Sequence, residues 1–107
     1  MTKVDTAELV TALKNLKVHL KARRNLDVLV RQGYSSRELV FELSGRSRLS
    51  GILTTMGCGG GWRTKALVSA ASLRGFVLHP PGESTTYMSF HDGRLHIGTW
   101  SCPAREQ

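Results

Sequence analysis

Apolar and polar residues alternate along this chain with two different periods, and the change of period separates helix from strand. Near the N-terminus, four leucines recur at the i, i+4, i+7 and i+11 positions of one helix face: Leu9, Leu13, Leu16 and Leu20. This spacing predicts an amphipathic helix over residues 5–24. Asp5 or Thr6 can cap its first turn, and the acidic Glu8 suits the positive end of the helix.

From residue 26 onward the apolar period shortens to two, as in strands with one buried face. Four segments have this character: LDVLVRQ (26–32), RELVFELSG (37–45), RLSGILTTM (48–56) and RTKALVSA (63–70). The third loses its alternation at Ser50 and Gly51, where we expect a bulge.

The C-terminal third of the chain predicts a short helix followed by a hairpin. SAASLRGFVLH (69–79) places Leu73, Phe76 and Val77 on one side of the helix, and Pro80 ends it. TTYMSFHDGRLHIGTW (85–100) alternates on both sides of Asp-Gly, which predicts a type I′ hairpin turn. The last residues, SCPAREQ (101–107), have no clear strand pattern, so we expect the chain to trail off there.

A helix followed by strands occurs twice in this order of elements. The two half-repeats cover about 1–56 and 63–107, and the residues themselves hardly match between them. With 107 residues, 40% apolar, and no linker, the chain predicts one folded domain of the α+β class, with two helices packed on an antiparallel sheet.

Charge is the strongest compositional signal. Fifteen Lys and Arg against eight Asp and Glu give a net charge of +7, which favours a polyanionic partner, nucleic acid first. Four cations of the first helix recur at spacings of three and four: Lys14, Lys17, Lys21 and Arg24. They form a stripe, the basic ridge, roughly 90° around the helix from the leucines. This ridge either faces phosphates or is a solvated helix face, although residues 9–26 contain no acid to pair with it.

The glycine-rich stretch MGCGGGWRTK (56–65) raises the alternative of a phosphate loop. It lacks the G-x-x-x-x-G-K-[ST] spacing and is followed by a strand pattern instead of a helix. We therefore interpret it as the connection between the half-repeats, with Trp62 covering the core. Stacking on single-stranded nucleic acid remains a second possibility for Trp62 beside Arg63, and for Tyr34 near Arg31 and Arg37.

Other chemistry has little support in the sequence. No nucleophile motif and no carboxylate cluster can be assembled. Cys58 and Cys102 predict two free thiols, and the four histidines show no metal-ligand spacing. We expect a protein that is not an enzyme, without cofactor or metal. No apolar run is long enough to span a membrane, and acids occupy the N-terminus where a signal peptide would be apolar, so we expect a cytoplasmic protein.

The order of elements resembles one domain of the sliding DNA clamps, such as the beta subunit of the bacterial replicase. Three segments carry the resemblance: KVDTAELVTALKNL (3–16), ELVFELSGRSRLSG (38–51) and ALVSAASLRGFVLHPPGESTTYMSFHDGRLHIG (66–98). The resemblance implies two pseudo-symmetric units of the form β-α-β-β or β-α-β-β-β, with two helices packed on an antiparallel sheet. A clamp ring contains six such domains and this chain supplies one, so the resemblance implies that encircling DNA would take about six copies or a partner. Because unpaired end strands favour edge-to-edge association, as between clamp subunits, we expect a homo-oligomer.

Clamp helices present cations to the DNA backbone, and here they would be residues 5–24 and 70–78. The resemblance thus implies a nucleic-acid-binding set: Lys14, Lys17, Lys21, Arg23, Arg24 and Arg74. We expect sequence-independent binding to duplex DNA or docking on a DNA-processing assembly. Two alternatives stay open. The first is an interaction module, such as an inhibitor or decoy, that binds an acidic protein. The second is an enzyme of unrecognised type.

Overall fold

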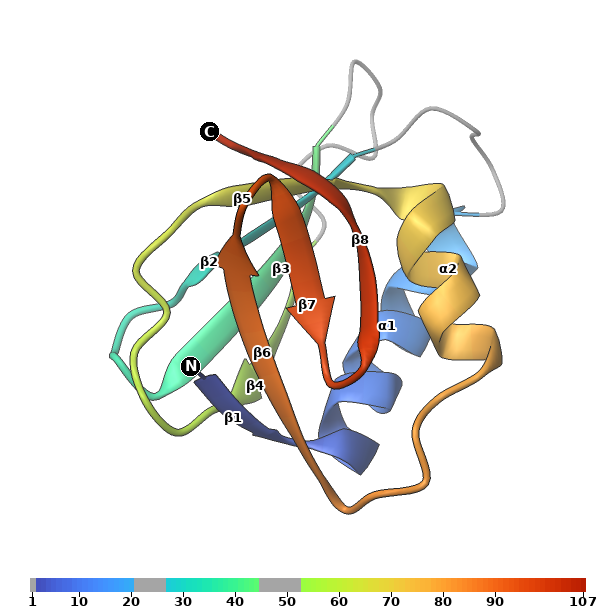
Figure 1. Cartoon of the computed structure of the whole chain (residues 1–107), viewed down its shortest axis with the longest axis horizontal. Helices are drawn as coiled ribbons and strands as arrows, with labels where there is room; N and C mark the ends of the chain where they lie inside the picture. Colours follow the sequence, from blue (N-terminus) through green and yellow to red (C-terminus); the bar gives the residue numbers. More distant parts are fainter. Residues whose placement is uncertain (1, 21–26, 45–52) are drawn as a thin grey trace.

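The protein is an α+β fold of two helices and eight strands, seen in a computed structural model that describes residues 2–20, 27–44 and 53–107 (Figure 1). In chain order the elements are β1 (Thr2–Asp5), α1 (Thr6–Leu20), β2 (Asp27–Gln32), β3 (Glu38–Ser44), β4 (Leu53–Gly57), β5 (Ala66–Ser69), α2 (Ala70–Leu78), β6 (Thr85–His91), β7 (Arg94–Ile97) and β8 (Trp100–Glu106). The sequence strand, helix, strand, strand, strand therefore occurs twice.

All eight strands belong to one antiparallel sheet in the order β1-β6-β7-β8-β5-β2-β3-β4. The two end strands approach each other just after β4. There the Lys3 amide donates to the Gly59 carbonyl at 2.8 Å, and the Gly59 amide donates to the Lys3 carbonyl at 2.7 Å. These two hydrogen bonds bring the sheet close to closing on itself.

The pairing register repeats between the two halves of the chain. The β1–β6 pair runs from Asp5↔Thr85 to Thr2↔Met88. The β5–β2 pair runs from Ser69↔Asp27 to Ala66↔Val30, with the same number of residues between. Because the register agrees residue for residue, the half-repeats are related in their hydrogen bonding as well as in their order of elements.

Burial in the two helices follows the same positions. The first turns of α1 bury Thr6, Leu9, Ala12 and Leu13. In α2 the equivalent positions are also buried and hold Ala70, Leu73, Phe76 and Val77. The inward residues expected for the second helix are therefore confirmed, and the leucine seam of the first is confirmed for Leu9, Leu13 and Leu16.

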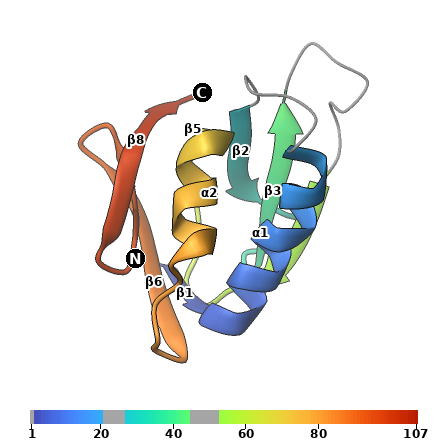
Figure 2. The ribbon, with the colours of Figure 1, turned by 90° about the vertical axis from the view of Figure 1, so that its right-hand side faces the viewer.

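The two helices lie side by side on one side of the molecule and run in opposite directions (Figure 2). The Thr6 amide donates to the Ser84 carbonyl at 3.0 Å, which ties the start of α1 to the segment that follows α2. Apolar side chains of both helices and of the inner sheet face form one core. Trp100 of β8 packs against Phe76 of α2, with ring centroids 5.5 Å apart.

The hairpin turn is confirmed, because Asp92 and Gly93 have φ values of 54° and 70°, as a type I′ turn requires. The expectation that residues 101–107 trail off is wrong, since most of them form β8, which joins β7 to β5. Pro103 marks the change of partner: residues 100–103 pair with β7 and residues 104–106 with β5. The expected bulge at residues 50–51 and the helix residues 21–24 lie outside the described residues.

Candidate nucleic-acid interface

The exposed side of α1 and α2 is where the sequence places its cationic set. Lys14 lies on α1 between the buried Leu13 and Leu16, and its own side chain is exposed. Lys17 also belongs to α1, but its side chain is not among those described. Lys21, Arg23 and Arg24 follow α1 and lie outside the described residues. The structure therefore locates two side chains of the predicted set, Lys14 and Arg74.

Arg74 of α2 is partly buried, although we expected it to face outward. Its Nε has no contact with solvent and no hydrogen-bond partner in the described part of the chain. Arg74 occupies the position in α2 that Val10 occupies in α1, and Val10 lines a cavity with Pro80 and Pro81 beyond the end of α2. The internal repeat thus places Arg74 on the side of α2 that faces α1.

Acidic side chains on this side gather at the start of α1. Asp5 caps the helix, because its Oδ2 accepts a hydrogen bond from the Glu8 amide at 3.0 Å. Asp5 and Glu8 line a cavity with Thr55 and Met56 of β4. Asp5 also lines, together with Glu83, the cavity that Val10 shares with Pro80 and Pro81. Negative charge at the helix start and the Lys14 cation further along fit the macrodipole of α1.

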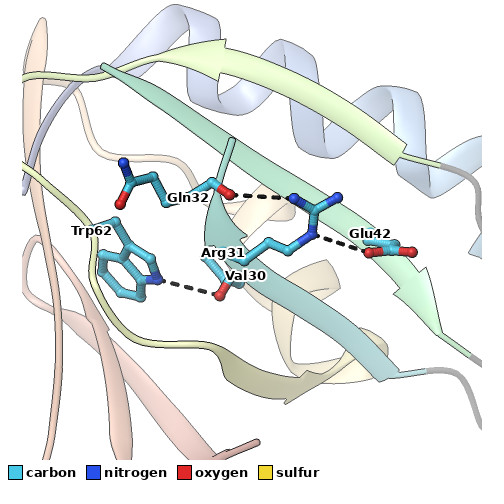
Figure 3. A network of polar contacts seen from close by, with 5 residues as sticks. All are labelled: Val30, Arg31, Gln32, Glu42 and Trp62. Atoms are coloured by element: carbon cyan, nitrogen blue, oxygen red, sulfur yellow. Dashed lines mark hydrogen bonds and ion pairs between the residues drawn. The ribbon is translucent and has the colours of Figure 1, made fainter. Parts of the chain in front are cut away.

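Two arginines on the sheet are paired with acidic side chains. Arg31 Nε lies 3.2 Å from Glu42 Oε2, and its Nη1 donates to the Gln32 carbonyl at 3.2 Å (Figure 3). Arg105 Nη2 lies 3.3 Å from Asp27 Oδ2. Within the described ranges, neither Lys14 nor Arg74 has an acidic partner of this kind. Among the described residues, cations without an acidic partner thus occur on the helix side and also on the sheet, at Lys3 and Arg94, while Arg31 and Arg105 are neutralised.

The glycine-rich stretch is a connection, as we interpreted it. Trp62 is 4% exposed, and its Nε1 donates to the Val30 carbonyl at 3.2 Å (Figure 3). The amides of Cys58 and Gly59 donate to the carbonyls of Arg37 and Lys3 at 2.8 and 2.7 Å. Because the fold already uses these two amides, they are not free to surround a phosphate.

Of the rings considered for base stacking, Trp62 is buried in the core and Tyr34 is fully exposed at the turn between β2 and β3. Tyr87 of β6, which we did not predict as a stacking ring, is 50% exposed. The sequence contained a signal for the exposure of Tyr87. The outward positions of the β6 alternation hold Tyr87, Ser89 and His91, on the face opposite to Met88.

Both thiols are free, as expected. Burial raises the pKa of Cys58, which is partly exposed. Burial also raises the pKa of Cys102 to about 11, a rise that the nearby Arg94 charge opposes. Neither environment favours a reactive thiolate. Among the described residues, no three His, Cys, Asp or Glu side chains come together as metal ligands.

Comparison of the chain with protein-family models, with curated proteins and with solved structures found no match. In the part of the chain that the structure describes, neither helix has the length and apolar character needed to cross a membrane. The geometry on the helix side therefore carries the functional interpretation by itself.

Proposed function

We propose that this protein is a non-enzymatic, clamp-like domain that binds the phosphate backbone of duplex DNA through the side formed by α1 and α2. The observation that carries the proposal is that Lys14 and Arg74, the two described side chains of the predicted set, lack acidic partners within the described ranges. On the sheet, Arg31 and Arg105 have such partners, whereas Lys3 and Arg94 have none in the described part of the chain. A cation is available to phosphate when no carboxylate already neutralises it.

The buried Arg74 Nε supports the same side of the molecule. A buried donor without a partner costs free energy until an acceptor reaches it. The internal repeat places Arg74 on the flank of α2 toward α1, and Lys14 is the residue of the predicted ridge whose side chain is described. A phosphate oxygen held between the helices would accept from this guanidinium and stand close to the ridge.

The internal repeat supports a clamp-like domain. Two β-α-β-β-β units share their pairing register and bring two helices together on one side of an antiparallel sheet. Rigid strands behind both helices hold their outward side chains at a fixed separation. Such a surface suits the regular backbone of a duplex and has no need to read bases.

We further propose that the protein acts as a homo-oligomer. Strand β4 pairs with β3 from Glu42↔Leu53 to Glu38↔Gly57. On its other side, the described pairing is the single bridge Lys3↔Gly59, which lies just beyond the strand. An edge that is largely open in this way can accept a strand from a second copy.

Fluorescence anisotropy with a labelled 20-base-pair duplex tests the proposal. The variant Lys14→Glu/Lys17→Glu/Lys21→Glu reverses the basic ridge, and we expect it to lose most duplex binding at moderate salt. The matched control is Arg37→Glu/Arg63→Glu/Lys65→Glu, which makes the same change of charge at exposed residues off the helices. We expect the control to weaken binding only slightly.

Equal losses in the two triple variants would show that net charge alone attracts DNA, and the helix-side interface would be wrong. Wild-type protein that ignores duplex at 50 to 150 mM salt but forms a complex with an acidic protein would favour the interaction module instead. Solution mass measured across a concentration series reports the oligomeric state separately from DNA binding.

A further inference from the structure

The outer face of β6, β7 and β8, on the other side of the sheet from α2, carries exposed rings and cations. The pairing register defines which side chains share this face. Lys3 lies opposite Tyr87, Ser89 opposite His96, and His91 opposite Arg94. We call Lys3, Tyr87, His91, Arg94 and His96 the sheet platform.

The rings of the sheet platform are open to ligand. Tyr87 is 50% exposed, and Gly98, which follows β7, donates through its amide to the Tyr87 carbonyl at 2.8 Å. Ser89 and Ser101, the two residues beside His96, are also small. The side chains around the rings therefore protrude little from the sheet.

His91 and His96 extend the aromatic surface. Their rings stack almost parallel, with centroids 4.1 Å apart and an interplanar angle of 9°. The His91 side chain is 57% exposed, so the pair presents a ring to solvent. His96 Nε2 is buried and has no hydrogen-bond partner among the described residues. No group in the described fold satisfies this nitrogen.

Charge on the sheet platform is predominantly positive. Lys3 lies beside Tyr87, and Arg94 lies beside His91 while donating through Nε and Nη2 to Ser101 Oγ at 3.2 Å. The nearby acid is Asp92 at the hairpin turn, whose Oδ2 lies 3.2 Å from His91 Nδ1. Cations at both ends of a row of rings match a polyanion that also carries flat, stackable groups.

We propose that the sheet platform is a second nucleic-acid site that binds single-stranded DNA or RNA by base stacking. Bases stack on Tyr87 and on the His91–His96 pair, while Lys3 and Arg94 hold the phosphates. Tyr87 and His91 lie four residues apart on β6, about 13 Å along the strand, so they contact different nucleotides. Exposed aromatic rings on an open antiparallel sheet stack two or three bases in this way. This site is independent of the duplex interface proposed for the helices.

Anisotropy with a labelled 20-nucleotide oligo-dT tests the proposal, with an abasic chain of the same length as the matched probe. We expect wild-type protein to bind oligo-dT at least fivefold more tightly than the abasic chain, because stacking requires bases. Tyr87→Ala and His91→Ala should each weaken oligo-dT binding at least fivefold, and Tyr87→Phe should keep it. The three substitutions are at two exposed positions, and thermal unfolding verifies that each variant is folded.

The ridge variant Lys14→Glu/Lys17→Glu/Lys21→Glu separates the two sites. We expect it to lose duplex binding and to retain the preference for oligo-dT over the abasic chain. Conversely, Tyr87→Ala/His91→Ala should leave duplex binding intact. Three results would overturn the sheet platform. The first is equal affinity of the wild-type protein for oligo-dT and the abasic chain, and the second is unchanged oligo-dT binding in Tyr87→Ala/His91→Ala. The third is no binding of oligo-dT at 50 mM salt. None of these three results bears on the helix-side proposal.

Discussion

The side-chain hydroxyls of Thr6 and Thr86 lie 2.6 Å apart and form a buried hydrogen bond between the first residue of α1 and strand β6. Thr6 is 6% exposed and Thr86 is 3% exposed. The repeated register shows that the equivalent positions are Ala70 and Val28, which are also buried. Each pair joins the two half-repeats, and one of these junctions uses a polar pair where the other uses an apolar pair.

Replacing these threonines should show strong coupling. Thr86→Val leaves the Thr6 hydroxyl buried without its partner, at a cost of about 1–3 kcal/mol, and Thr6→Ala does the same to Thr86. The double variant Thr6→Ala/Thr86→Val copies the equivalent apolar pair, Ala70 and Val28, and should recover most of the loss. Urea unfolding of the four proteins measures the coupling. Additive losses would show that the two hydroxyls do not depend on each other.

Two glycines should respond to alanine with opposite signs. Gly75 is inside α2, and a Cβ there meets nothing within 4 Å, so Gly75→Ala should stabilise the fold by about 0.5–1 kcal/mol. Gly93 has φ of 70° in the hairpin turn, and Gly93→Ala should destabilise by about 1 kcal/mol or more. Thermal unfolding of both variants beside wild type compares them directly. A shift of the same sign in both would contradict one of these two backbone conformations.

The sequence was most informative where one local signal decides an element. The leucine spacing indicates α1, and Asp92-Gly93 indicates the hairpin turn. Strand β8 was missed because its apolar phase is weak: Trp100, Cys102 and Ala104 alternate, but Pro103 interrupts the pattern. A proline is tolerated there because the strand exchanges partners at that residue.

Pairing across the fold could not be predicted from the residues. The Gly59 bridge to Lys3 depends on backbone groups alone, so glycines that look like a turn also bring the sheet close to closing. Ion pairing could not be predicted either, because the sequence shows how many cations there are but not which acid lies beside each of them. Arg31 is neutralised by Glu42, while Lys14 has no acid beside it in the described ranges. The basic ridge could be predicted from the sequence, but the structure was needed to show which cations have no acidic partner.

Duplex binding should depend steeply on salt if the ridge contacts phosphates. Log K falls linearly with log salt concentration, with a slope of about −0.9 for each neutralised phosphate. Replacing Lys14, Lys17 and Lys21 with glutamine should therefore make the slope shallower by about 2 to 3. The same change at Arg37, Arg63 and Lys65 should leave the slope close to wild type. Anisotropy titrations at four or more salt concentrations give both slopes, and equal slopes in the two variants would contradict phosphate contacts by the ridge.

Cys102 should make stability depend on pH at the alkaline end. Burial raises its pKa from 9.0 to about 11, so the folded protein keeps a proton that the unfolded chain has already lost. Its stabilising effect is complete below pH 9 and is lost as pH rises toward 11. Urea unfolding of Cys58→Ser and of Cys58→Ser/Cys102→Ala across this range isolates the effect, because only the first still carries Cys102. We expect a steeper alkaline decline in Cys58→Ser, and parallel declines would place the Cys102 thiol in contact with water.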